Sequence, residues 1–126
     1  MFSLQTIFGK GDKFYGLLEA SAAATRESTR ALSELLATPA PQRSLEKFKL
    51  ARQREKNLAA QISQELVNTF VTALEREDID ELSSALYKIP KIVEKFAERY
   101  VLAAERLGDV DFASRAAMLE RASEVI

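Results

Sequence analysis

The sequence predicts an all-α protein, folded as an antiparallel helical bundle. Ala, Leu, Glu, Lys and Arg dominate its 126 residues, which include four Gly and three Pro. That composition is typical of long helices. Apolar residues recur at intervals of three and four, which places them along one side of each helix. The breaks between these runs are short, and short connections favour antiparallel packing of consecutive helices.

The first helix is expected from Asp12, a suitable N-cap, to Ala37. Its apolar stripe has a run of small side chains at its middle, which lets a neighbouring helix approach closely: Ser21, Ala24, Thr25 and Ser28. Pro39 and Pro41 end the helix, because proline cannot donate a backbone hydrogen bond and disfavours helix in the residue before it. Ahead of the helix, residues 2–8 form a short apolar arm closed by two glycines. We expect this arm to pack on the bundle or on a partner subunit, and a weak anchor on a membrane surface is the alternative.

The second helix follows Ser44, its expected N-cap. Its stripe consists of Leu45, Phe48, Ala51, Glu55, Leu58, Ile62, Leu66 and Phe70. Glu55 interrupts this apolar stripe. Because burial of an unpaired carboxylate is costly, we expect it at the edge of the stripe or paired with a nearby base such as Arg52, Arg54 or Lys56. A buried functional acid is the alternative.

The third helix has the longest apolar stripe in the chain. It is expected to start near Glu75 or Arg76 and to end at Leu107, with Gly108 as its terminator. The stripe consists of Ile79, Leu82, Leu86, Ile89, Val93, Phe96, Tyr100, Ala103 and Leu107. Because the stripe stays in phase across Pro90, we expect a kink there rather than a break.

An acidic turn precedes this stripe, formed by Glu75, Glu77, Asp78, Asp80 and Glu81. Carboxylates at the start of a helix complement the partial positive charge of its N-terminus, so we interpret them as capping and dipole partners rather than as a cation site.

A weaker fourth segment completes a single domain over residues 1–126. Asp109 or Asp111 is its expected N-cap, and its stripe consists of Phe112, Ala116, Leu119 and Val125. Either this segment is a short fourth helix, or it belongs to a longer one.

The residue inventory disfavours an enzyme. Cys and His are absent, which excludes disulfides, thiolate nucleophiles, zinc sites of the usual kind and histidine acid–base chemistry. A glycine-rich phosphate loop is also absent, so we expect no cofactor. The basic run 43–56 contains one aromatic residue, Phe48, which gives little support to nucleic-acid binding. No apolar run approaches the roughly 20 residues of a membrane span, and the start lacks the features of a signal peptide.

Residues 69–79, TFVTALEREDI, resemble the PhoU-like family of phosphate-transport accessory proteins. In that family one helix ends near T-F-x-T-P-x-D and the next begins with R-E-D-I; here Ala73 replaces the proline and Glu75 the aspartate. The resemblance extends less specifically over residues 2–107 and implies one three-helix half of a two-half bundle, followed here by the fourth segment. It implies a non-enzymatic accessory or regulatory protein of inorganic phosphate transport. Such a protein would be cytoplasmic, peripheral to the inner membrane through a transporter, and homodimeric, so that two chains complete the bundle.

The metal-binding motifs of the family do not carry over. Its first acidic motif falls on Arg52 and Lys56, and its second on Tyr87, Lys88 and Lys91. Ammonium and guanidinium groups offer no lone pair, so no metal is expected at these positions. Either Arg52, Lys56, Lys88 and Lys91 bind an anionic partner or phosphate, or the site has decayed to ordinary solvated residues. The alternative function is a metal- or phosphate-binding sensor that uses the remaining acidic or basic surface residues.

Overall fold

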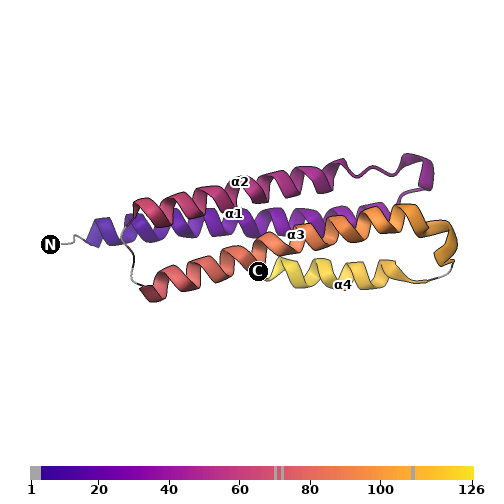
Figure 1. Ribbon diagram of the computed structural model, residues 1–126. Helices are drawn as coiled ribbons and strands as arrows, with labels where there is room; N and C mark the ends of the chain where they lie inside the picture. Colours follow the sequence, from indigo (N-terminus) through magenta and orange to yellow (C-terminus); the bar gives the residue numbers. More distant parts are fainter. Residues whose placement is uncertain (1–3, 70, 72, 109) are drawn as a thin grey trace.

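The chain forms an all-α helical bundle, as predicted, with its first helix at the centre. The computed structural model describes residues 4–69, 71, 73–108 and 110–126, without the side chains of 4–12, 73 and 74. Within these residues lie the helices α1 (Leu4–Ala37), α2 (Glu46–Asn68), α3 (Ala73–Leu107) and α4 (Phe112–Glu124), and a short 3-10 helix, η1 (Ala40–Gln42). Figure 1 shows the four long helices side by side, with α4 spanning about half the length of the bundle.

The start of α1 differs from the prediction. The helix begins at Leu4, well before Asp12, so the two glycines of the expected arm lie inside it. A glycine in a helix interior costs about 1 kcal/mol, which an otherwise continuous helix tolerates. The expected packing of the apolar side chains of residues 2–8 lies outside the described residues. The end of α1 at Ala37, before Pro39, is confirmed.

The middle of α1 is small, polar and buried. Ser21, Ala24, Thr25, Ser28 and Thr29 are almost completely covered. α1 packs against α2, α3 and α4, which small side chains permit because they let helix backbones approach closely. Apolar clusters lie on both sides of this polar layer: Ala31, Leu32, Leu35, Phe48, Val93, Ala97 and Ala116 form one, and Phe14, Ile62 and Leu66 form the other.

α2 buries the predicted stripe, including Phe48, Ile62 and Leu66. Its N-cap is Leu45 rather than the predicted Ser44, although the Ser44 hydroxyl oxygen still accepts a hydrogen bond from the Glu46 backbone N–H at 3.2 Å. The final predicted stripe position, Phe70, lies outside the described residues.

α3 begins at Ala73, slightly before the predicted start, so the acidic residues from Glu75 to Glu81 lie within its first turns rather than in a connecting turn. At the other end, the predicted termination at Leu107 is confirmed. Gly108 follows with φ of 58°, the left-handed conformation that glycine adopts without steric cost.

α3 continues through Pro90, as predicted, while the bend expected there stays a prediction. Proline has no N–H, so the Leu86 carbonyl loses its usual partner inside the helix. Thr25 of α1 supplies a donor: its hydroxyl lies 3.4 Å from the Leu86 carbonyl oxygen and 3.2 Å from that of Ser21. The cost of the internal proline is therefore partly offset by a hydroxyl from a neighbouring helix.

α4 is a short helix capped by Asp111, whose carboxylate accepts from the Ser114 N–H at 3.1 Å. The other predicted cap, Asp109, lies outside the described residues. The predicted stripe is wrong at Leu119 and Val125, which are exposed; Val125 is 87% exposed. α4 instead buries its small residues Ala116 and Ser123.

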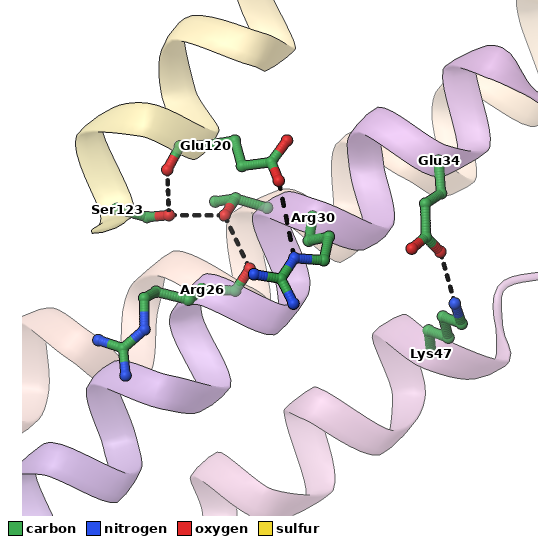
Figure 2. A network of polar contacts seen from close by, with 7 residues as sticks. Arg26, Arg30, Glu34, Lys47, Glu120 and Ser123 are labelled. Atoms are coloured by element: carbon green, nitrogen blue, oxygen red, sulfur yellow. Dashed lines mark hydrogen bonds and ion pairs between the residues drawn. The ribbon is translucent and has the colours of Figure 1, made fainter. Parts of the chain in front are cut away.

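The packing of α4 on α1 explains this choice of small residues. The hydroxyls of Thr29 and Ser123 lie 2.8 Å apart, which requires the two backbones to be close (Figure 2). Beside them, Arg30 Nε lies 3.7 Å from Glu120 Oε1. On α3, Leu82 of the predicted stripe is 47% exposed, because the buried side of the helix runs through Ser83, Leu86, Pro90, Val93 and Ala97 instead.

Replacing Thr25 by Val should destabilise the protein by about 1 kcal/mol, because the Leu86 carbonyl loses its donor. In a Pro90→Ala background, residue 90 regains the N–H that can bond to the same carbonyl, so Thr25→Val should cost less there. Denaturant unfolding of the four proteins measures this coupling. An equal cost of Thr25→Val in both backgrounds would contradict the role assigned to Thr25.

Candidate functional site

The predicted basic residues lie around a contact between α2 and α3. The guanidinium carbon of Arg52, on α2, lies 5.4 Å from the centre of the Tyr87 ring on α3. Its Nε lies 3.6 Å from Oε1 of Glu94, about two helical turns after Tyr87 on α3. The Arg52 side chain is 14% exposed, so the ring and the carboxylate hold its charge in a fixed position.

Arg52 is incompletely satisfied by these contacts. Its Nε and Nη1 atoms are buried and have no hydrogen-bond partner among the described residues. The Glu94 carboxylate is close enough for attraction between opposite charges, but at 3.6 Å it is too far for a good hydrogen bond. Glu94 therefore balances the charge of Arg52 without satisfying these two buried donors.

The other predicted residues take different places around this contact. Lys56 lies one turn after Arg52 on the same side of α2, and Lys91 lies between Tyr87 and Glu94 on the same side of α3. Because Arg52 contacts Tyr87 and Glu94, these two sides face each other across the helix pair. We call Arg52, Lys56, Tyr87, Lys91 and Glu94 the α2–α3 seam.

Lys88 does not belong to this seam. It directly follows Tyr87, and consecutive residues of an α-helix point about 100° apart. Lys88 is exposed on the outer side of α3. Helical spacing thus assigns Arg52, Lys56 and Lys91 to the seam and Lys88 to the adjoining face. Lys56, Lys88 and Lys91 are all exposed, and none makes an ion pair with another described residue.

Sequence reasoning missed Glu94 as a partner of Arg52. The available signal was the spacing of Tyr87, Lys91 and Glu94, which recur at four and three residues and so share one side of a helix. The relative height of α2 and α3, which decides that Arg52 meets Tyr87 and Glu94, is not encoded in that spacing. It depends on how both helices pack on α1.

The favoured interpretation of Glu55 is wrong. Glu55 is 1% exposed, neither at the edge of its stripe nor paired with a base. Its carboxylate accepts from the Ser21 hydroxyl, which lies 2.7 Å from Oε1 and 3.0 Å from Oε2. Arg52 and Arg54 instead form ion pairs with Glu94 and Glu27. The small residues of α1 leave room for this carboxyl group, so the helix pair encloses it.

Burial raises the pKa of Glu55 to about 7, because it removes water from the charged form. The Ser21 hydrogen bond and the positive charges of Arg54 and Arg52 act in the opposite direction and only partly offset this effect. Glu55 is therefore half protonated near neutral pH. Because its side chain is almost completely covered, its position favours a structural role.

Among the described residues, no group of three or more acidic side chains lies close enough to hold a metal ion. A shallow depression lies between the end of α2 and the start of α3, lined by Ser63, Leu66, Val67, Arg76, Glu77 and Asp80. It is open and mixed in charge, and it is separate from the seam. Within the described part of the chain, no helix is both long enough and apolar enough to cross a membrane.

Glu55 should make stability depend on pH. Between about pH 4.5 and 7 the folded protein keeps a proton that the unfolded chain releases, so the free energy of unfolding should fall by about 3 kcal/mol as pH rises through this range. Glu55→Gln should remove this fall and be more stable than the parent at pH 8. Urea unfolding from pH 5 to pH 8 measures both, with the exposed Glu27→Gln as a control that keeps the fall. An unchanged slope in Glu55→Gln would contradict the assignment.

Comparisons of this chain with protein-family models, with curated proteins and with solved structures find no match.

Proposed function

We propose that this protein is a non-enzymatic accessory or regulatory protein, and that its α2–α3 seam binds an acidic surface of a partner protein. The observation that carries this proposal is the arrangement of charge at the seam. Lys56 and Lys91 are exposed and unpaired among the described residues, and they flank Arg52, whose position is held by Tyr87 and Glu94.

A fixed guanidinium beside two mobile ammonium groups suits a carboxylate-rich protein surface. Arg52 loses little side-chain freedom on binding because it is already held, while the lysines can adjust to the partner. Opposite charges on two surfaces also speed their encounter and select against wrong partners.

The seam suits a small anion less well. A phosphate ion bound to Arg52 would have to compete with the Glu94 carboxylate, which already lies 3.6 Å from Nε. The same carboxylate would repel the phosphate. A broad acidic surface can instead use the two lysines without displacing Glu94. The geometry therefore favours a protein partner over the phosphate-binding sensor.

The resemblance of residues 69–79 to PhoU-like proteins supports a particular partner, an inorganic phosphate transporter at the cytoplasmic side of the membrane. Counting from that stretch places Arg52 and Tyr87 at positions of two separate family motifs. These two positions contact each other here, with the Arg52 guanidinium 5.4 Å from the Tyr87 ring centre. This contact supports the proposal that both motif positions contribute to one surface, on which Arg52, Lys56 and Lys91 supply positive charge.

Reversing the charge of the seam should weaken binding of this partner. We expect Lys56→Glu with Lys91→Glu to lower the affinity for the inorganic phosphate transporter of the source organism, reconstituted in lipid nanodiscs, by at least about tenfold. Both residues are exposed, so the melting temperature should change little. Biolayer interferometry with immobilised nanodiscs gives the affinities.

The matched control is Arg115→Glu with Arg121→Glu, two exposed positions on α4 with the same change in net charge. It should bind as the parent does. Equal binding of the seam variant and the parent would show that the seam has no role in docking. Titration of the parent with inorganic phosphate by calorimetry tests the sensor alternative, which requires saturable heat.

A further inference from the structure

The outer face of α3, opposite its buried side, separates its charges by sign. The exposed residues Glu77, Glu81, Ser84, Lys88, Lys91 and Lys95 follow one another at alternating intervals of four and three, so they lie along one side of the helix. We call these six residues the outer face. Within these six residues the first part is acidic, the last part is basic, and Ser84 lies between them; the exposed Glu98 follows at the next interval.

This separation leaves charges unpaired within the chain. Exposed helices are commonly stabilised by opposite charges four residues apart, whereas like charges at that spacing repel. Here Glu77 and Glu81 are four residues apart, and so are Lys91 and Lys95. None of these four residues makes an ion pair with another described residue.

The helix dipole does not account for the pattern. Its effect is confined to the first and last turns. α3 runs from Ala73 to Leu107, so Glu81 lies beyond the first turn and Lys88 to Lys95 lie in the middle of the helix. The dipole of α3 therefore does not explain the charges of the outer face from Glu81 to Lys95.

We propose that the outer face of α3 binds the outer face of a second copy of this chain, with the two helices antiparallel. Glu77 and Lys95 lie nine residues on either side of position 86, and Glu81 and Lys91 lie five residues on either side. A twofold axis at this position brings each glutamate opposite a lysine of the other copy. Twofold interfaces are self-complementary in this way, because each contact occurs twice.

The centre of the face favours close approach. Ser84 and Lys88 lie two residues on either side of position 86, and the small side chain of Ser84 leaves room for the longer one opposite it. Beside this row, Ala85 and Ile92 are also exposed, which supplies apolar surface that a second helix would cover. The interface is mainly electrostatic, so association should be weak and sensitive to salt.

This inference does not depend on the proposed function, although Lys91 belongs to both surfaces. The second copy and an acidic partner would compete for that lysine. The acidic half of the outer face separates the two proposals, since Glu77 and Glu81 have no part in docking an acidic partner.

Two variants test the interface in sedimentation equilibrium experiments. Glu77→Lys with Glu81→Lys leaves only basic charges on the face, and Lys91→Glu with Lys95→Glu leaves it acidic except at Lys88. Each variant alone should dimerise at least about tenfold more weakly than the parent at low salt. An equimolar mixture of the two should form a heterodimer, and about 0.5 M NaCl should dissociate it.

Further variants keep the result decisive. A chain with all four reversals restores self-complementarity and should dimerise as the parent does. Glu19→Lys with Glu124→Lys, at exposed positions away from the outer face, is the charge-matched control and should leave dimerisation intact. A parent that stays monomeric at low salt, variants that dimerise normally, or a mixture that does not associate would each overturn the proposal. Unchanged transporter binding by the basic variant would show that docking is independent of dimerisation.

Discussion

The structure depends on three hydroxyl groups on successive turns of α1, each of which binds a different neighbouring helix. Ser21 donates to the Glu55 carboxylate of α2, Thr25 to the Leu86 carbonyl of α3, and Thr29 lies 2.8 Å from the Ser123 hydroxyl of α4. Small side chains are required at these positions because each bond needs two backbones close together. An apolar core of larger residues would hold the helices further apart and leave these polar groups unsatisfied.

This polar layer explains why the bundle tolerates two unfavourable residues. Pro90 removes a backbone hydrogen bond from the middle of α3, and Glu55 places a carboxyl group in the core. Each would be costly alone. Thr25 donates to the carbonyl that Pro90 leaves without a partner, and Ser21 donates to the Glu55 carboxylate. Both hydrogen bonds lie in the same polar layer, and each reduces the cost of one of these residues. The arrangement also sets the relative heights of the helices, since polar contacts are directional whereas apolar contacts tolerate sliding.

The helix heights in turn create the candidate binding surface. Arg52 meets Tyr87 and Glu94 because α2 and α3 are both aligned on α1. A shift of one turn along either helix would move Arg52 away from both partners. The seam and the outer face of α3 lie next to each other and share Lys91. Protein docking and self-association, as proposed, would therefore influence each other through a single helix.

The sequence by itself determined the fold class, the C-terminal ends of α1 and α3, with Gly108 after the latter, and most of the buried residues. These features follow from local rules, because prolines, glycine and apolar spacing act within one helix. The tertiary structure alone decided three other features. Glu55 is buried because α1 offers a hydroxyl and space, Leu82 is exposed because α3 turns Ser83 rather than Leu82 toward the core, and Arg52 is paired with Glu94 rather than Glu55. Each depends on which residues of different helices lie at the same height, and periodicity within one helix carries no information about that.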